Sequence, residues 1–128
     1  MKLKGVTPVV VPERECEVRE KGILQDGGLS EDTVVEFKSI PEGTEYLQYY
    51  GENLISDYQV FKEGSKAEEE GYDAVQADCI FDPALDELKE ALDIPVVGPL
   101  QTSIHLACLL GKTFSVIVND DSMIKFIE

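Results

Sequence analysis

Basic residues are scarce in this sequence: 11 lysines and arginines stand against 26 aspartates and glutamates, a formal net charge of −15 at pH 7. A surface with this charge repels the phosphate backbone of nucleic acids and anionic lipid headgroups. We therefore expect no nucleic-acid partner and no membrane partner. The acidic run Glu68, Glu69 and Glu70 is expected to be a solvated helix face rather than a metal site.

Long apolar runs are also missing. The longest near the C-terminal half, residues 104–110, is interrupted by His105 and is far too short to cross a bilayer. The N-terminal residues MKLKGV lack the apolar core and the cleavage site of a signal peptide. These absences predict a cytoplasmic protein, and 128 residues with 43% hydrophobic side chains suffice for one compact fold.

Metal ligands, paired cysteines and glycine signatures are few as well. Cys16, Cys79 and Cys108 are an odd number without CxxC spacing, and a single histidine accompanies them. This set predicts neither a disulfide framework nor a metal site. The sequence contains no GxGxxG motif, no phosphate-binding loop and no GxSxG serine motif, so we expect no cofactor.

What is present is an alternation of short apolar strands with helical stretches. It predicts an α/β fold, a three-layer sandwich with a mainly parallel sheet. Ligands of such sheets bind beyond the carboxyl ends of the strands, which selects the loops that start at Thr7, Asp78 and Gly98. The predicted strands are residues 2–6, 33–40, 72–77, 94–97 and 113–118; the predicted helices include residues 13–21 and 44–70, the latter interrupted near Gly51 and with Leu54, Tyr58, Phe61 and Ala67 on one face; residues 25–32, with Gly27 and Gly28, are a predicted loop.

Cys79 follows one of these strands and precedes a well-signalled helix start, with Asp82 as a natural N-cap and Pro83 as a natural first helical residue. A helix N-terminus lowers the pKa of a nearby thiol, so Cys79 is a candidate catalytic acid or base. The backbone amides of Ile80 and Phe81 are candidate donors to an anion. From position alone, a small side chain packed under the helix is an equally open interpretation of Cys79.

Four nearby or related residues receive weaker predictions. Asp78 would raise the pKa of the Cys79 thiol if it pointed the same way, but strand alternation directs it elsewhere. Cys108 is expected in the core, on a helix that packs on the sheet, and His105 is expected to be partly buried there. Cys16 lies among glutamates that disfavour a thiolate, although the first strand's loop is close.

Several blocks of the sequence resemble, in order and spacing, those of hydantoin racemases and their relatives in the aspartate, glutamate and hydantoin racemase superfamily. The blocks are GYDAV at 71–75, Cys79 with DPAL at 82–85, DIPVVG at 93–98 and LGKTFSVI at 110–117, with a weaker one, IPEGTEYL, at 40–47. The resemblance implies a cofactor-independent enzyme of two similar Rossmann-like or flavodoxin-like halves. A cysteine from each half flanks a small substrate and exchanges a proton at the carbon next to a carbonyl or carboxylate.

The resemblance also implies residue roles and a domain division. Cys79 aligns with the first catalytic cysteine, and the expected substrate-binding positions are Thr7, Pro8, Val9, Ile80, Phe81 and Gln101. Residues 1–112 correspond to one racemase-type domain, and residues 113–128 to the first strand and opening helix of a second half.

The sequence departs from the family in two ways. The second cysteine falls beyond residue 128, and the loop 7–10 lacks the asparagine and hydroxyl pattern that hydantoin racemases use. The leading hypothesis is a racemase of an amino acid, a hydantoin or a related carbonyl compound, incomplete in this chain. The alternatives are a single-cysteine decarboxylase or cis-trans isomerase of a small diacid, and a binding or assembly domain. The apolar end, with Met123, Ile124 and Phe126, favours a homo-oligomer.

Overall fold

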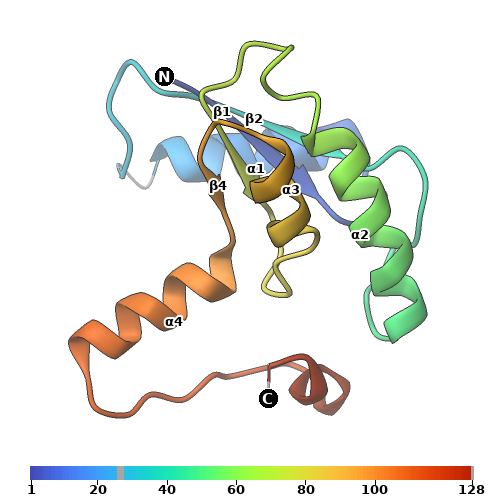
Figure 1. Ribbon diagram of the computed structural model, residues 1–128, viewed down its shortest axis with the longest axis vertical. Helices are drawn as coiled ribbons and strands as arrows, with labels where there is room; N and C mark the ends of the chain where they lie inside the picture. The colour runs from blue at the N-terminus through green and yellow to red at the C-terminus, as the bar shows by residue number, and fades with distance from the viewer. Residues whose placement is uncertain (26–27, 128) are drawn as a thin grey trace.

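The structure is a computed structural model of the chain, and it describes residues 1–25 and 28–127. Gly27 of the predicted loop therefore lies outside the described residues. The first four predicted strands are confirmed, each within two residues at either end. The elements follow in the order β1 (Lys2–Thr7), α1 (Glu13–Gln25), β2 (Val34–Ser39), α2 (Tyr50–Gly64), β3 (Ala74–Ala77), α3 (Leu85–Ala91), β4 (Val96–Val97), α4 (Pro99–Leu110) and the 3₁₀ helix η1 (Asp121–Phe126) (Figure 1).

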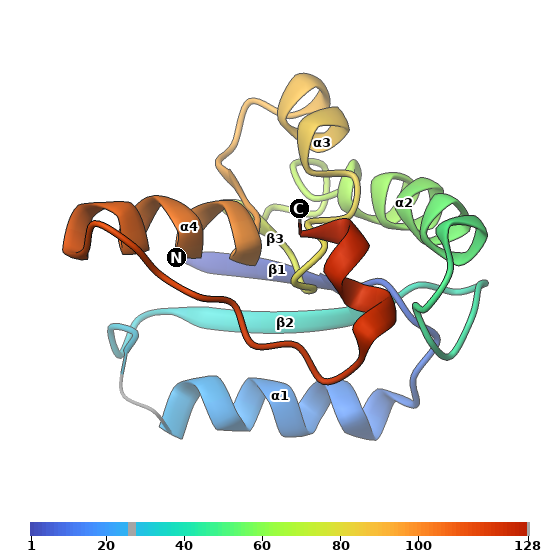
Figure 2. The same cartoon turned by 90° about the horizontal axis from the view of Figure 1, so that it is seen from below.

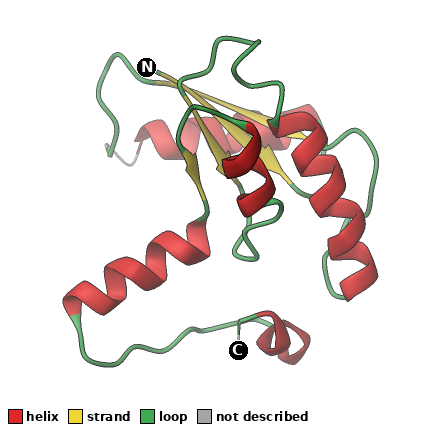
Figure 3. Ribbon diagram, viewed as in Figure 1, coloured by secondary structure: helices red, strands yellow, loops and turns green. Residues whose placement is uncertain are grey.

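The four strands form one parallel sheet in the order β2-β1-β3-β4 (Figure 3). In β1, Gly5 lies opposite Phe37 of β2 and Gln76 of β3. A Cβ on Gly5 would lie only 2.3 Å from the Phe37 ring, so the missing side chain leaves that ring room to pack across the strand. The parallel pairing and the helical crossovers confirm the predicted α/β class.

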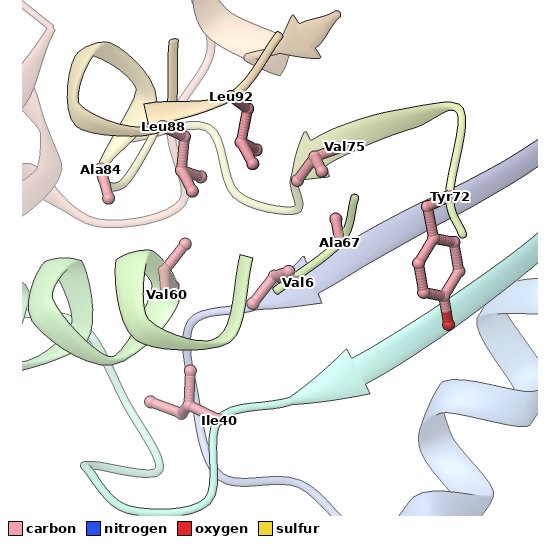
Figure 4. Close-up of a cluster of buried hydrophobic side chains, with 9 residues drawn as sticks. All are labelled: Val6, Ile40, Val60, Ala67, Tyr72, Val75, Ala84, Leu88 and Leu92. Atoms are coloured by element: carbon pink, nitrogen blue, oxygen red, sulfur yellow. The ribbon is translucent and has the colours of Figure 1, made fainter. Parts of the chain in front are cut away.

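Helices cover both faces of this sheet, which gives three layers (Figure 2). On one face α1 packs against β2, where Cys16 clusters with Val35 and Phe37. On the other face α2 and α3 enclose the larger core, because alternate side chains of a strand point to opposite faces. That core consists of Val6, Ile40, Val60, Ala67, Tyr72, Val75, Ala84, Leu88 and Leu92 (Figure 4).

The face that α2 turns to the sheet differs from the predicted one. Leu54 and Tyr58 were expected to pack inward, but their side chains are 72% and 63% exposed. The residues that α2 buries are Ser56, Gln59, Val60 and Gly64. Gly64 has no side chain because Leu88 of α3 fills the space, with Cδ2 2.8 Å from an ideal Cβ. The close approach of α3 sets the rotation of α2 about its axis, and local periodicity does not contain that information.

The helix α4 does not pack on the sheet, contrary to expectation. None of its twelve residues, all described, is buried, and the ribbon runs away from the other layers (Figure 1). Cys108 is therefore exposed rather than in the core, and His105 is exposed with its Nδ1 2.7 Å from the Gln101 carbonyl oxygen. Within the described ranges, no helix is long and apolar enough to span a membrane.

The predicted strand at residues 113–118 is also wrong. These residues belong to no strand, and in Figure 1 the segment crosses below the sheet without joining it. A β-strand needs a neighbouring strand for its backbone hydrogen bonds. After α4 this segment lies away from β4, the edge strand of the sheet, so its backbone has no neighbouring strand to pair with. The division at residue 112 stays a prediction.

A buried lysine lies within the central strand β1. The side chain of Lys4 is 0% exposed, and its Nζ donates to the Glu63 carbonyl oxygen at 2.8 Å, to Glu63 Oε1 at 3.0 Å and to Glu70 Oε2 at 2.7 Å. All three ammonium donors are thus used, as a buried charge requires. The run Glu68 to Glu70 is exposed as predicted, but it lies in turns beyond the end of α2 at Gly64 and not on a helix, so the expected helix over residues 44–70 is too long at both ends. Glu70 also neutralises Lys4.

Candidate active site at the carboxyl edge of the sheet

Cys79 lies just beyond the carboxyl end of β3, in a tight turn. Its amide donates to the Ala77 carbonyl oxygen at 2.8 Å, and its own carbonyl oxygen accepts from the Asp82 amide at 3.1 Å. The side chain is half-buried. This is the position at which parallel α/β sheets bind ligands, so the prediction for the location of Cys79 is confirmed.

Burial raises the pKa of the Cys79 thiol above its ordinary value. The backbone amide of Phe81 opposes this shift by hydrogen bonding to the sulfur, and the Ile80 amide does so more weakly. The carboxylates of Asp78 and Asp82 add to the shift. At neutral pH the group is therefore a thiol, suited to donate a proton, with two amides in place to stabilise the thiolate that remains.

The expected lowering of that pKa by a helix N-terminus is wrong, because α3 begins only at Leu85. Asp82 is not its N-cap: Asp82 has a φ of 48°, and the cap position is Ala84 with a φ of 53°. The Asp82 carboxylate instead accepts from the amides of Leu100 at 2.9 Å and Gln101 at 2.7 Å, in the first turn of α4. The side chain of Asp82 thus caps α4, and not α3, the helix that directly follows Asp82 in the sequence.

Gly98 makes this remote capping possible. A Cβ at Gly98 would lie 2.5 Å from Cγ of Asp82, so any side chain there would displace the carboxylate. Pro99 follows as the first residue of α4, where its missing amide proton is not needed. The Gly98-Pro99 pair in the sequence indicates a helix start. The sequence does not indicate that the cap of this helix comes from Asp82.

Asp78, the residue before Cys79, is held by two side chains from other elements. Thr7 Oγ1 at the end of β1 donates to Asp78 Oδ2 at 3.1 Å, and Arg19 of α1 forms an ion pair with the same oxygen. Burial raises the pKa of the Asp78 carboxyl, and Arg19 and Thr7 oppose the shift. The carboxylate does point away toward α1, yet its charge still acts on the Cys79 thiol.

The remaining predicted site residues are only partly brought together. Thr7 and Pro8 are buried and Val9 is half-buried, and Thr7 contacts the Cys79 loop through its hydrogen bond to Asp78. Gln101 is exposed, and Lys89 donates to its side-chain oxygen.

Three hollows border the Cys79 loop, and one of them, of about 290 Å³, lies between Phe81, Phe126 and α2. Ile80 faces an apolar groove of about 470 Å³ between α4 and the segment 114–117, lined also by Pro99, Leu100, Ile104 and Phe114. Phe81 and Gln101 share a smaller, acidic hollow of about 320 Å³ with Asp57, Asp82 and Glu87. Phe81 also meets Phe126 of η1, with ring centroids 4.7 Å apart. The loop is therefore bordered on both sides by the C-terminal part of the chain.

The other two thiols belong to other parts of the molecule. Cys16 is 4% exposed and packs between α1 and β2, and burial raises its pKa. Cys108 is on the exposed helix α4. Among the residues the structure describes, no group of three or more histidine, cysteine or carboxylate side chains is placed to hold a metal ion.

Sequence reasoning missed Arg19 as a site residue. It lies in the middle of a helix whose surface is otherwise charged, and nothing local marks it. Its partner Asp78 is 59 positions away in the sequence. The one clue to Arg19 was that α1 follows β1 and crosses back along the sheet, which can bring a long cationic side chain to the edge where the predicted site lies.

Known protein sequences resemble most of this chain. The sequence model of the family described as Asp/Glu/hydantoin racemase matches residues 21–128. A hydantoin racemase from Pseudomonas sp. (strain NS671) is 37% identical over 86 residues, which cover 67% of this chain and 34% of that protein. A hydantoin racemase from Paenarthrobacter aurescens is 29% identical over 86 residues, which cover 66% of this chain and 36% of that protein.

Two solved structures share the fold. The allantoin racemase from Klebsiella pneumoniae superposes with a TM-score of 0.86 at 16% identity, over 99% of this chain and 51% of that one. The allantoin racemase from Pseudomonas fluorescens gives a TM-score of 0.82 at 20% identity, over 99% and 52%. At these identities the likeness shows the fold alone. The chain spans about a third of the curated relatives it matches and about half of the solved chains.

Proposed function

The chain belongs to the Asp/Glu/hydantoin racemase family, and from this premise we propose that it supplies one catalytic half of a cofactor-independent racemase. The proposed substrate is a hydantoin or a related small carbonyl compound, such as an amino acid, with an acidic hydrogen on the carbon next to the carbonyl. Cys79 is the proposed acid–base group. The observation that carries the proposal is the half-buried Cys79 thiol in the turn that directly follows the carboxyl end of β3.

The chemistry follows from the protonation state of the thiol. A base removes the hydrogen from one face of the carbon, and the electron pair of the broken C–H bond is delocalised into the carbonyl as an enolate. The Cys79 S–H then delivers its proton to the opposite face, which forms the new C–H bond and leaves a thiolate. The amides of Phe81 and Ile80 stabilise that thiolate, and in the reverse direction the thiolate is the base.

Inversion needs an acid–base group on each face of the substrate, and Cys79 accounts for one. Because the chain spans about half of the solved racemase chains, the second group in this proposal comes from a further half, in a longer protein or a second polypeptide. The exposed helix α4 and the groove beside Ile80 are the surfaces that such a half would adjoin. The cytoplasmic location and the homo-oligomer expected from the sequence stay predictions.

The test is hydrogen–deuterium exchange at C5 of L-5-isopropylhydantoin in D₂O. Proton NMR measures the exchange as loss of the C5–H signal, and optical rotation measures inversion. In D₂O the thiolate form of Cys79 removes the proton and the resulting S–D group, which exchanges with solvent, returns a deuteron. Exchange should therefore rise with pH as the thiolate forms, and it reports on Cys79 even where inversion needs a partner. We expect exchange above the buffer rate, reduced about 10²-fold or to the buffer rate in Cys79→Ser.

Cys108→Ser is the matched control, because that thiol is exposed on α4 and should leave the exchange rate unchanged. Equal exchange in wild type and Cys79→Ser would contradict the proposal. One observation favours a second candidate function: a single thiol with a raised pKa is suited to protonate the enediolate that remains after loss of carbon dioxide. Carbon dioxide released from a substituted malonate, with no hydantoin exchange, would support that decarboxylase instead.

A further inference from the structure

Three elements converge on the carboxylate beside Cys79. Asp78 follows β3, Thr7 ends β1 and Arg19 belongs to α1. Both Thr7 Oγ1, at 3.1 Å, and the Arg19 guanidinium contact the same oxygen, Oδ2 of Asp78. The Asp78 amide donates to the Val6 carbonyl oxygen at 2.9 Å, so the backbone is fixed as well. Few conformations are left to the residue that precedes Cys79.

We propose that Arg19, Asp78 and Thr7 form a positioning cluster that places the Cys79 loop and balances the charge beside the thiol. The proposal rests on the proposed function only in treating Cys79 as the acid–base group. Arg19 and Thr7 act on Cys79 through Asp78, and none of the three is assigned a contact with substrate.

The burial of the cluster argues for a role beyond holding the loop. Thr7 is 0% exposed, and the Asp78 side chain is 16% exposed. An ionised carboxylate at this depth is unfavourable, and burial accordingly raises its pKa. An asparagine would accept the same hydrogen bonds without the charge. A carboxylate at this position is therefore explained by an effect of its charge, and the group next to it that such a charge affects is the Cys79 thiol.

The charged groups that act on Cys79 are two carboxylates. Asp78 and Asp82 both raise the pKa of the thiol, and the amides of Phe81 and Ile80 oppose them. Asp82 is occupied by the first turn of α4, where it accepts from two backbone amides. Asp78 is balanced by the side chain of Arg19, which is 41% exposed. Arg19 is therefore the point at which the charge beside Cys79 can be changed without disturbing the core.

The experiment measures the pH dependence of Cys79 alkylation by iodoacetamide, quantified on the Cys79 peptide by mass spectrometry so that Cys16 and Cys108 stay in place. The variants are Arg19→Gln, Asp78→Asn and the double variant. Arg14→Gln is the matched control, another exposed arginine of α1. Arg19→Lys keeps the charge, and thermal melts establish that each variant is folded.

Arg19→Gln should shift the Cys79 titration upward by about 0.5 to 1 pH unit, because the Asp78 charge is then unbalanced. Asp78→Asn should shift it downward, and adding Arg19→Gln to Asp78→Asn should shift it upward by less than Arg19→Gln does alone, because the direct attraction of the Arg19 charge is lost in both backgrounds but its hold on the carboxylate is lost only where Asp78 is present. Arg19→Lys and Arg14→Gln should titrate like the wild type. The proposal is overturned if Arg19→Gln leaves the titration unchanged, or shifts it equally with and without Asp78.

Alkylation and racemisation fail independently. The predicted pattern of titrations without C5 exchange would support the cluster and contradict the proposed function. Exchange that depends on Cys79, together with a titration insensitive to Arg19, would support the function and contradict the cluster.

Discussion

Asp57 shows at the scale of one residue how a half-buried carboxylate affects stability. It lies on α2, and burial is the main cause that raises its pKa; the Glu87 carboxylate adds to the shift, and a hydrogen bond from the Ala84 amide opposes it. The native state thus binds this proton more tightly than the unfolded chain does. Its contribution to stability is present at low pH and is lost as the pH rises through the raised pKa.

We therefore expect Asp57→Asn to stabilise the protein at pH 7, where asparagine keeps an acceptor for the Ala84 amide and removes the charge. For a partly solvated group the gain should be modest, about 0.5 to 1 kcal/mol. Thermal melts at pH 7 and near pH 3 measure it, and the gain should disappear at the lower pH. Asp86→Asn, at an exposed position of α3, is the control. A destabilised Asp57→Asn protein at pH 7 would contradict this account.

How well a site residue could be predicted depends on how far away in the sequence its contact partners lie. Cys79 could be predicted because a strand, a thiol and a helix start follow one another within a few positions. The roles of Asp82 and Asp78 could not, because their partners lie 18 and 59 positions away. Asp82 is a sound N-cap by its local pattern, but its positive φ turns the carboxylate toward α4 instead of α3.

At the scale of an element, the Asp82 contact should govern the stability of α4, because this helix has a capped start and buries none of its residues. Removing the cap with Asp82→Ala should cost about 1 kcal/mol of local helix stability. Amide exchange in the first turn of α4, read by mass spectrometry, should become about fivefold faster. The melting temperature should change little, because α4 buries nothing in the core.

Two variants make that prediction sharp. Asp82→Asn keeps an oxygen acceptor and should restore most of the protection, whereas Asp86→Ala on α3 should leave exchange in α4 unchanged. Unaltered exchange at Leu100 and Gln101 in Asp82→Ala would show that the carboxylate does not cap the helix.

Elements that pair within the sheet were predicted well, and elements whose placement depends on contacts remote in the sequence were predicted poorly. The strands β1 to β4 are short apolar runs bounded by breakers, and each finds a parallel partner. Residues 113–118 have the same kind of pattern, but no strand lies beside them to complete a ladder. In α2, the spacing of Leu54 and Tyr58 fits an apolar helix face, but the close contact of Gly64 with Leu88 orients the helix so that both side chains face outward.

Across the whole molecule, strong self-repulsion opposes a large exposed apolar surface. The net charge is −15. At the same time Leu109, Leu110 and Ile117 are 83%, 81% and 94% exposed, next to the apolar groove beside Ile80. Apolar surface of this kind favours association, and like charge on two copies opposes it. Which of the two prevails depends on ionic strength, because salt screens only the repulsion.

We expect this chain to be largely monomeric at about 10 mM salt, where the Debye length is about 30 Å, and to self-associate at about 0.5 M, where it is only a few ångströms. Sedimentation velocity at the two salt concentrations measures the change. Replacing Leu109 and Leu110 with glutamine should abolish the association at high salt. Val18→Gln, at a position on α1 that is 62% exposed, should not. A monomer at both salt concentrations would mean that the apolar face of α4 is not sufficient to bind a second copy of this chain.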